Sequence, residues 1–539
     1  MKDKLISCIT LAAYTNVKEG NAMSIETGES ELYNAAVDLI DHNLAAGRGQ
    51  KTAIIDKSGS HSYQELSDNV NRFANALREL GILPEQRIVL CMNDSIDFHV
   101  CFLGAIKAGV IPVPINTRLI ANDYAFILED SRAVAVVVSD NLLASFEGHL
   151  ASHPELNTVI VSGEASGDHH ALSSLLASQS KEAIVARTRA DDMCFWAYTS
   201  GTTGMPKGTV HIHKSLKMTA ELYAIGTLGM NENDVVYPAP KLFFSYGLGA
   251  GLIFPLAVGA TSILLEGTPT AEAVADILIN KSPTIFFGVP TLYGMLLASN
   301  LLPEGESHNL RFCISAGEAL PAEILARWQK LTGLNLLDGI GSTEMLHIFL
   351  SNRPDDIRPG STGKPVPGYD IRLTGDDGLP VAQGEMGALE ISGPTSGIMY
   401  WNRREKSIET FQGPWTRAGD KYRQDEDGYY IYCGRTDDML KVGGIYVSPF
   451  EVEAALIEHE AVLEVAVVGK ADADGLIKPK AIIVPKSFDM DLDSMAEELK
   501  VFVKERLASF KYPRWIEFVD ELPKTATGKI QRFKLRKAG

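Results

Sequence analysis

One stretch of the sequence is the most informative about fold and function: Tyr198-Thr-Ser-Gly-Thr-Thr-Gly-Met-Pro-Lys-Gly208. It follows an apolar run, Met193–Ala197, that is typical of a strand. Its glycines allow close backbone approach, its hydroxyl and N–H groups can surround phosphate oxygens, and Lys207 adds a positive charge. A Walker loop needs a lysine followed by Ser or Thr, but here Pro206 precedes the lysine and Gly208 follows it. The stretch therefore predicts a phosphate-binding loop of a different kind.

Strand and helix patterns alternate on both sides of this loop. Thr52–Asp56 has the composition of a strand, and the capping box Ser62-Tyr-Gln-Glu65 begins a helical pattern that stops at Gly81. Further strands are expected at Arg87–Met92, Ile111–Ile115, Val134–Val138, Asp234–Tyr237, Thr284–Val289 and Leu310–Ser315. This alternation predicts an α/β fold whose parallel strands are covered by helices on both faces.

The composition changes after about residue 360, where glycines, prolines and hairpin-like turns such as Asp425–Gly428 dominate. The last hundred or so residues have a compact α+β pattern, with strands expected at Val465–Gly469, Lys480–Val484 and Trp515–Val519 and a helix at 493–509. We therefore predict an N-terminal domain over residues 1–436, with a β-rich subdomain at about 360–436, and a small C-terminal domain over residues 437–539.

Composition and charge exclude several classes of protein. The chain has 539 residues, 45% of them hydrophobic and 22% charged, with a formal net charge of −18. Such a chain is not mainly disordered, and its negative field disfavours nucleic acid and anionic lipid as partners. The six cysteines are scattered without a C-x-x-C pair, so we expect reduced thiols in a cytoplasmic protein.

Two apolar segments resemble membrane elements only superficially. Residues 5–14 loosely mimic a signal peptide, but no clean cleavage site follows them, and Met23 is an alternative start to Met1. The uncharged run 243–265 is long enough to span a bilayer, but its glycines and Pro255 favour a loop, a buried helix and a buried strand. We therefore expect no membrane association.

Ordered motifs along residues 30–537 resemble those of the acyl-adenylate-forming enzymes, which include acyl- and aryl-CoA ligases, peptide-synthetase adenylation domains and firefly luciferase. The motifs are the phosphate loop, Gly341-Ser-Thr-Glu344, Thr416-Arg-Ala-Gly-Asp420, Gly434-Arg-Thr-Asp-Asp438 and Pro523-Lys-Thr-Ala-Thr-Gly-Lys529. Two further segments, Lys241–Gly249 and Gly339–His347, are most similar to bacterial benzoate–CoA and 4-hydroxybenzoate–CoA ligases. The order of the motifs makes the resemblance far more specific than any one of them.

The resemblance implies a fold and a reaction. The fold has a large N-terminal domain of parallel α/β sheets with a β-rich subdomain, and a small mobile C-terminal domain. In the reaction, a carboxylate attacks the α-phosphate of ATP to give an acyl-AMP and pyrophosphate, and the thiol of CoA then displaces AMP. Such chemistry depends mainly on positioning and electrostatic stabilisation.

Residues at the motif positions receive the family's roles by this resemblance. Glu344 would carry Mg²⁺, Thr343 would contact the α-phosphate, and Lys529 would bridge the carboxylate and the α-phosphate in the transition state. Asp437 would be the hinge of the C-terminal domain. The expected ATP- and AMP-binding residues are Thr199, Ser200, Gly201, Thr202, Thr203, Gly204, Lys207, Gly317, Glu318, Ala319, Asp338, Gly339, Asp420 and Arg435. The expected CoA-binding residues are Lys441, Gly443 and Gly444.

The expected aryl-binding residues combine flat apolar groups with a few polar ones. They are Phe244, Ser245, Tyr246, Ile340, Gly341 and His347, with Phe243 beside them. Because Ser245, Tyr246 and His347 can hydrogen-bond to a para-hydroxyl, we expect both benzoate and 4-hydroxybenzoate as substrates. The alternative is that His347 packs under the nucleotide loop and Ser245 caps a helix. The sequence leaves open the relative preference among aryl acids, the oligomeric state and the groups that hold the CoA nucleotide.

Other functions are less favoured by the residues. The chain could activate another carboxylic acid or load a carrier protein, but amino-acid-activating relatives carry an Asp near Phe244–Ser245 that is absent here. A catalytically silent nucleotide-binding regulator would have lost Lys529 or Glu344, and both are present. His211 and His213 form an H-x-H pair without further metal-ligand spacing, so we expect them to be structural.

Overall fold

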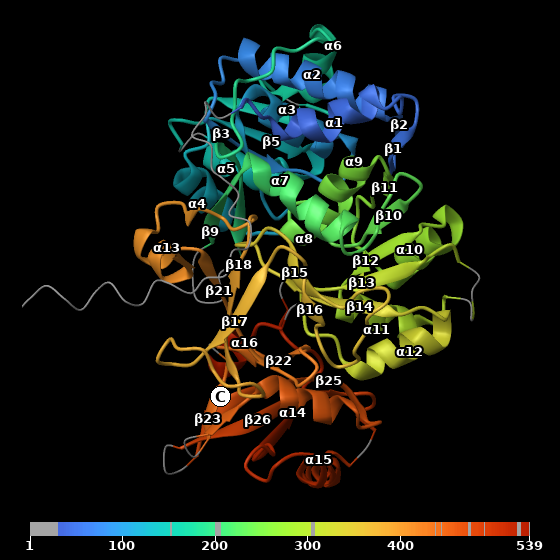
Figure 1. Cartoon of the computed structure of the whole chain (residues 1–539), viewed down its shortest axis with the longest axis vertical. Coiled ribbons are helices and arrows are strands. Elements are labelled where there is room, and N and C mark those ends of the chain that lie inside the picture. The colour runs from blue at the N-terminus through green and yellow to red at the C-terminus, as the bar shows by residue number, and fades with distance from the viewer. Residues whose placement is uncertain are drawn as a thin grey trace, which may run out of the picture.

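Two sheets of mostly parallel strands form the large N-terminal part of the chain (Figure 1). The computed structural model describes residues 31–537 except 151–152, 166, 200–205, 303–304, 306–307, 437, 443–444, 473–475, 490 and 525–529. The largest sheet is parallel from β14 to β1 and has antiparallel strands at its edges. In spatial order its strands are β16 (Lys364–Pro365), β15 (Ile348–Ser351), β14 (Leu336–Gly341), β13 (Phe312–Ser315), β12 (Ile285–Gly288), β10 (Val235–Pro238), β11 (Thr261–Ile263), β1 (Thr52–Asp56) and β2 (Gly59–Ser62).

The second sheet is parallel throughout. In spatial order its strands are β4 (Ile111–Pro114), β3 (Arg87–Cys91), β5 (Ala135–Ser139), β6 (Thr158–Ser162) and β7 (His170–Ala171). All the strands predicted in the first third of the sequence are present, with ends shifted by a residue at most. The prediction of an α/β fold with parallel sheets is confirmed.

The strands place alternate side chains in separate cores, as a period of two residues requires. Ile88 and Leu90 of β3 lie in one hydrophobic core with Phe287 of β12 and with helices α2 and α3, which therefore fill the space between the sheets. Val89 and Cys91 belong to a second core, on the outer face, together with residues of α4 and α5. Helices α10, α11 and α12 cover the outer face of the largest sheet in the same way (Figure 1).

The helices of this part begin and end at the following residues: α1 (Ala35–Ala45), α2 (Tyr63–Glu79), α3 (Ile96–Ala108), α4 (Ala121–Ser131), α5 (Ala144–Leu150), α6 (Leu172–Ser178), α7 (His213–Thr219), α10 (Ala271–Asp276), α11 (Pro290–Ser299) and α12 (Ala322–Thr332). The capping box predicted at the start of α2 is present, because Ser62 Oγ accepts from the N–H of Glu65 and the Glu65 carboxylate accepts from the N–H of Ser62.

The β-rich subdomain expected at about 360–436 contains an antiparallel sheet. Its strands are β17 (Asp370–Thr374), β18 (Gly387–Ser392), β20 (Phe411–Gln412), β21 (Trp415–Gln424) and β22 (Tyr430–Arg435). The predicted turn Asp425–Gly428 joins β21 to β22. A smaller antiparallel sheet has β9 (Lys207–Ile212) in its centre, paired with β8 (Met193–Thr199) on one side and with β19 (Met399–Tyr400) on the other. Helix α13 (Arg404–Thr410) follows β19 in the chain.

The C-terminal residues form a separate small α+β unit, drawn in orange to red at the bottom of Figure 1. Its sheet runs in the order β25 (Val462–Ala471), β26 (Ile477–Pro485), β27 (Trp515–Phe518), and its own core includes residues of α14 (Pro449–Ile457) and α15 (Leu492–Arg506). A hairpin of β23 (Leu440–Val442) and β24 (Ile445–Val447) precedes them, and α16 (Arg532–Lys537) follows. The boundary between residues 436 and 437 stays a prediction, since Asp437 lies outside the described residues.

The apolar run 243–265 folds as predicted from its glycines and Pro255. It divides into α8 (Ser245–Leu248), the π-helical turn η3 (Gly249–Ile253), α9 (Phe254–Val258) and strand β11. No helix in the described part of the chain is long and apolar enough to cross a membrane. Within the same residues Cys91, Cys101, Cys194, Cys313 and Cys433 are unpaired.

Candidate functional site

The predicted phosphate loop is the connection of the hairpin β8–β9. Thr199 at the end of β8 pairs with Lys207 at the start of β9. The intervening residues, among them Ser200, Gly201, Thr202, Thr203 and Gly204, lie outside the described residues. The Nζ atom of Lys207 lies 4.9 Å from the centroid of the Tyr400 ring, a cation–π distance. The loop therefore leaves and rejoins the sheet beside Tyr400.

Tyr400 also fastens the turn that carries Thr343 and Glu344. Its hydroxyl donates to Glu344 Oε1 at 2.5 Å, and the N–H of Gly397 donates to the Glu344 carbonyl at 2.6 Å. Burial and the nearby carboxylate raise the pKa of Tyr400, so it keeps its proton. The structure thus gathers Lys207, Thr343 and Glu344 around one tyrosine.

His211 supports the same turn from the other side. Its Nε2 lies 2.8 Å from the carbonyl oxygen of Thr343, and burial lowers the pKa of the ring to about 4, so the neutral ring donates there. His213 Nδ1 accepts from the N–H of Ala35 at 3.2 Å. Both histidines form hydrogen bonds with backbone groups, as expected for structural residues.

The acidic groups near the loop suit a metal that arrives with a polyphosphate. Across the described ranges, no group of three or more His, Cys, Asp or Glu side chains could hold a metal ion. Mg²⁺ in nucleotide sites typically takes one or two carboxylates and completes its shell with phosphate oxygens and water. The single carboxylate of Glu344, next to the ends of the phosphate loop, fits this pattern.

Asp420 and Arg435 lie opposite each other on β21 and β22. Arg435 Nη1 is 3.4 Å from both carboxylate oxygens of Asp420 and donates to the carbonyl of Ala418 at 3.2 Å. The Arg435 charge also lies close enough to lower the pKa of Tyr400 slightly against the effect of burial. The predicted ribose residues therefore lie near the phosphate end of the site.

The predicted adenine residues lie at the carboxyl ends of β13 and β14, the edge where ligands bind in open α/β sheets. Gly317 follows β13 with a φ of +90°, which a residue with a side chain rarely adopts, and Glu318 and Ala319 come next. Asp338, followed by Gly339, is on β14, and its Oδ1 is buried without a hydrogen-bond partner among the described residues. Burial raises the pKa of Asp338. A ligand amino group could satisfy that oxygen.

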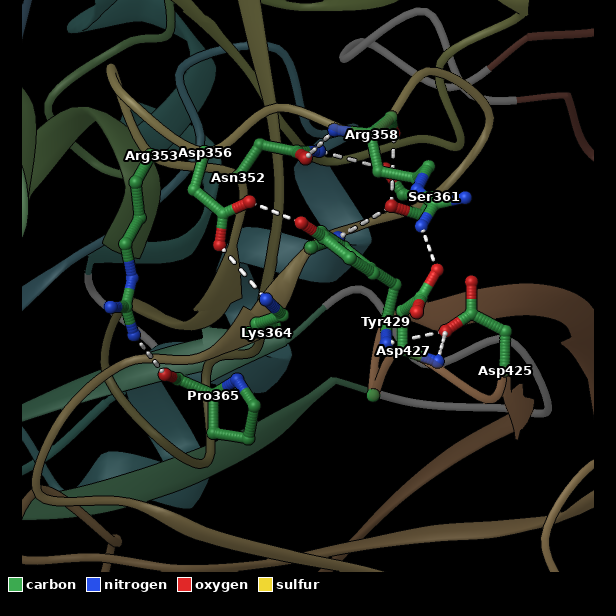
Figure 2. A network of polar contacts seen from close by, with 12 residues as sticks. Asn352, Arg353, Asp356, Arg358, Ser361, Lys364, Pro365, Asp425, Asp427 and Tyr429 are labelled. Atoms are coloured by element: carbon green, nitrogen blue, oxygen red, sulfur yellow. Dashed lines mark hydrogen bonds and ion pairs between the residues drawn. The ribbon is translucent and has the colours of Figure 1, made fainter.

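Figure 2 shows a network of polar contacts between the segment 352–365, which follows β15, and the turn 425–429, which precedes β22. Asn352 donates its N–H to the Asp338 carbonyl at 2.9 Å, and its side chain donates to Ser361 at 2.8 Å. Further along, Tyr429 donates to Asp356, which also accepts from Lys364 at 3.0 Å. Because Tyr429 immediately precedes β22, this network fixes the strand of Arg435 against the strand of Asp338.

The predicted aryl wall follows β10. The Phe243 and Phe244 rings contact each other at a tilt of 58°, with centroids 4.4 Å apart, and the centroid of the Tyr246 ring lies 6.0 Å from that of Phe287 of β12. His347, at the end of the turn after β14, packs 5.5 Å from Tyr246. Ile340 and Gly341 are the last residues of β14. All six predicted aryl residues therefore lie on two neighbouring segments, the β10–α8 turn and the β14–β15 turn.

Two of the four polar side-chain atoms of this wall already have partners. The Tyr246 hydroxyl donates to the carbonyls of Gly288 and Ile314, at 3.1 and 3.3 Å, so its proton is already used within the protein. His347 Nε2 donates to the Tyr246 carbonyl at 3.1 Å, and burial lowers the pKa of the ring to about 3. Ser245 does not cap α8, since its buried Oγ has no partner in the described structure, nor has His347 Nδ1. These two buried atoms are therefore unsatisfied within the described structure.

The C-terminal residues are only partly described. Lys441 lies on β23, opposite Tyr446 of β24, while Asp437, Gly443, Gly444 and Lys529 lie outside the described residues. Arg532, three residues after Lys529, donates to both carboxylate oxygens of Glu453 on α14 at 2.9 and 2.6 Å. The segment that follows the predicted catalytic lysine is thus anchored on the C-terminal domain.

Comparison with known proteins decides the family. Residues 42–401 match the AMP-binding enzyme family, and residues 451–529 match the AMP-binding enzyme C-terminal domain. The chain belongs to the AMP-binding enzyme family. It is 57% identical over 94% of its length to a benzoate–CoA ligase of Thauera aromatica, of which the match covers 96%. It is 49% identical, over 94% of each chain, to a 4-hydroxybenzoate–CoA/benzoate–CoA ligase of Rhodopseudomonas palustris.

A solved structure of an anthranilate–CoA ligase, AuaEII, in complex with anthranoyl-AMP, matches this AMP-binding enzyme with a TM-score of 0.90. The two share 43% identity, and the match covers 94% of this chain and 97% of the other. The suspected superfamily and the expected adenylate-forming fold are therefore confirmed.

Sequence reasoning missed several residues that brace the site of this AMP-binding enzyme. Tyr400 is one, and Asp130 is another: it accepts from the hydroxyl of Tyr198 at 2.8 Å, next to the phosphate loop, and pairs with Arg403 at 3.3 Å. The sequence offered no signal for them, because their partners are more than fifty residues away along the chain.

Proposed function

We propose that this chain is an AMP-forming aryl-CoA ligase that converts 4-hydroxybenzoate, benzoate or both, with ATP and CoA, to the aryl-CoA, AMP and pyrophosphate. The observation that carries the proposal is the aromatic wall of Phe243, Phe244, Tyr246 and His347 beside the end of β14, next to the nucleotide residues. Similarity over nearly the full length to benzoate– and 4-hydroxybenzoate–CoA ligases supports it.

In the first half-reaction, the nucleotide residues bring two anions together. Adenine would lie at the ends of β13 and β14, the ribose hydroxyls would donate to Asp420, and the phosphates would lie along the loop that ends at Lys207. Lys529 would bridge the acid and the α-phosphate, where charge develops. Neutral His211 holds the Thr343 carbonyl, so the Thr343 side chain is presented in a fixed orientation.

Mg²⁺ bound with ATP would be held by Glu344 and would neutralise phosphate charge during the attack. Tyr400 orients that carboxylate by donating to Oε1. Phe243, Phe244 and Tyr246 exclude water around the aryl ring, which protects the acyl-AMP from hydrolysis.

In the second half-reaction, the small domain would turn about Asp437, so that Lys529 leaves and the β23–β24 hairpin approaches. Gly443 and Gly444, having no side chains, would leave a passage for the pantetheine arm beside Lys441. The thiol then attacks the acyl carbon, and AMP leaves. We expect the enzyme to work in the cytoplasm, without nucleic-acid or membrane partners.

A panel of carboxylic acids tests the proposal. AMP formation is measured with ATP and Mg²⁺, with and without CoA, for benzoate, 4-hydroxybenzoate, 2-aminobenzoate, cyclohexanecarboxylate and a medium-chain fatty acid. We expect CoA-dependent turnover that is fastest with one of the first two acids. Acid-dependent release of pyrophosphate that CoA does not accelerate would indicate an acyl acceptor other than CoA, as in a carrier-protein-loading enzyme, and preference for the fatty acid would exclude the aryl assignment.

A further inference from the structure

A buried ion pair holds the start of the aryl wall. Asp94 follows β3 of the second sheet, and Lys241 follows β10 of the largest sheet. Asp94 Oδ2 lies 3.5 Å from Lys241 Nζ, and Asp94 Oδ1 accepts from the N–H of Leu242 at 3.1 Å. One carboxylate, itself 2% exposed, therefore binds both the side chain of Lys241 and the backbone of the next residue.

Lys241 extends this connection to a third strand. Its ammonium group donates to the carbonyl of Leu265, just after β11, and lies 3.5 Å from that of Glu266. An apolar side chain could not bind the Asp94 carboxylate and a main-chain carbonyl at once. The pair thus fixes the β10–α8 turn relative to β3 and β11 by directional contacts.

The position of Lys241 determines the position of the aryl wall. The N–H of Phe244 donates to the Lys241 carbonyl at 3.0 Å, and the N–H of Leu248 donates to the Phe244 carbonyl at 2.7 Å. A Cβ on Gly247 would lie 2.0 Å from the Lys241 carbonyl oxygen, so α8 lies directly against this backbone. Any shift of Lys241 therefore moves Ser245 and Tyr246, the residues of the wall on α8.

Packing alone does not hold the turn on its outer side. A cavity of about 640 Å³ is lined by Asp94, Lys241 and Phe243, so this side of the turn faces open space. Because the cavity leaves part of this side open, the ion pair and its hydrogen bonds restrain the turn there in addition to the apolar side chains that line the cavity.

We propose that Asp94 and Lys241 are positioning residues for the carboxylic acid substrate: they set the β10–α8 turn and with it the aryl wall, without touching the acid or ATP. The proposal rests on the aryl-binding role given to this wall above. Small displacements of a binding wall reduce binding of the group that packs on it, because productive geometry is held within fractions of an ångström.

The chain offers a matched control on the same strand. Asp234, just before β10, is equally buried and pairs with Arg311 at 2.8 Å, while it accepts from Thr284 Oγ1 at 2.8 Å and from the N–H of Asn231 at 2.9 Å. In a parallel sheet the amino ends of the strands lie on the edge opposite the carboxyl ends. Breaking this pair therefore measures loss of stability without disturbing the aryl wall.

The test compares three variants, Asp94→Asn, Lys241→Met and the Asp94→Asn/Lys241→Met double variant, with the control Arg311→Met. For each, the KM of benzoate, the KM of ATP and the Tm are measured by pyrophosphate release and thermal unfolding. We expect Asp94→Asn and Lys241→Met to raise the acid KM about tenfold while the ATP KM stays within about twofold. The double variant should be no worse than the worse single change, because the two residues act as a unit. Lys241→Arg, which keeps the cation, should recover most of the loss.

Arg311→Met should lower the Tm at least as much as Asp94→Asn or Lys241→Met does. It should leave the acid KM within about twofold of wild type. The proposal is wrong if the acid KM of Asp94→Asn stays within that range, or if the ATP KM rises equally. Should Lys241→Met not fold, Asp94→Asn decides the matter, since it is isosteric and keeps an acceptor for Leu242. If wild type prefers a non-aryl acid, the aryl assignment fails, and the same KM comparison with that acid still tests the positioning role.

Discussion

The nucleotide side and the aryl side of the site differ in the kinds of side chain that form them. The nucleotide side gathers Lys207, Glu344 and Arg435 around Tyr400, and each of them has polar partners. The aryl side is a wall of rings in which Ser245 Oγ and His347 Nδ1 are buried without partners among the described residues.

This difference separates reaction chemistry from choice of acid. Charged groups that are already oriented can stabilise a transition state at once, so their loss should reduce kcat by large factors. Buried polar atoms without partners cost stability until a substrate group pairs with them, so their loss should change the ranking of acids by small factors.

The largest effect is expected for Lys529→Ala. In the proposed mechanism Lys529 acts only where the carboxylate attacks the α-phosphate, so acyl-AMP formation should fall about 1,000-fold, the upper range for removing one charge-stabilising donor. Thioester formation from supplied aryl-AMP should stay within a fewfold of wild type. Lys524→Ala is the matched control, since Lys524 lies in the same segment but pairs with Glu464 at 2.6 Å. Equal loss of both half-reactions would refute the assignment.

A smaller loss, about 100-fold in kcat, is expected for Glu344→Gln, which keeps the shape but removes the charge that we propose holds Mg²⁺. Saturation with Mg²⁺ should require higher concentrations, while the KM of benzoate stays within about twofold. Tyr400→Phe removes only the donor to Oε1, and it should cost about tenfold with the same Mg²⁺ signature. Rates measured across a Mg²⁺ titration check both, and an unchanged Mg²⁺ requirement in Glu344→Gln would contradict the metal role.

The same difference explains what the sequence could predict. The α/β fold followed from strand and helix periods, and the resemblance of ordered motifs to a known family gave Thr343, Glu344 and Asp420 their expected roles, because nucleotide chemistry needs fixed residue types. Asp94, Tyr400 and Asp130 were not predictable, since each acts through a partner distant in sequence, and an isolated acid or tyrosine has no distinguishing pattern. For the aryl wall, the resemblance named the residues, but only the structure shows that the Tyr246 hydroxyl already donates its proton to main-chain carbonyls.

Each side of the site contains one buried histidine whose lowered pKa predicts how the stability of the protein depends on pH. Burial lowers the pKa to about 4 for His211 and to about 3 for His347, below the unfolded value of about 6.5. The unfolded state therefore binds the extra proton first, and wild type loses stability as pH falls below 6.5. Relative to His211→Gln or His347→Gln, the advantage of wild type should shrink by at most about 1.4 kcal/mol per pH unit towards pH 4. Denaturant unfolding at pH 7.5, 6.0 and 5.0 measures the difference, and a constant difference would show that the ring titrates alike in both states.

The smallest effect is expected for Ser245→Ala, and it distinguishes the two sides most directly. The buried Ser245 Oγ lacks a partner in the described structure, so 4-hydroxybenzoate can pair with it while benzoate cannot. Its removal should lower kcat/KM for 4-hydroxybenzoate about fivefold and leave benzoate unchanged or slightly better, because an orphaned hydroxyl has been removed. Ser315→Ala makes the same change at another buried, partnerless hydroxyl, at the end of β13, where adenine is expected. That variant should alter the KM of ATP and leave the ratio of kcat/KM between the two acids unchanged. If Ser245→Ala does not move this ratio, or if Ser315→Ala moves it as much, the separation between an aryl side and a nucleotide side fails, while the family assignment is unaffected.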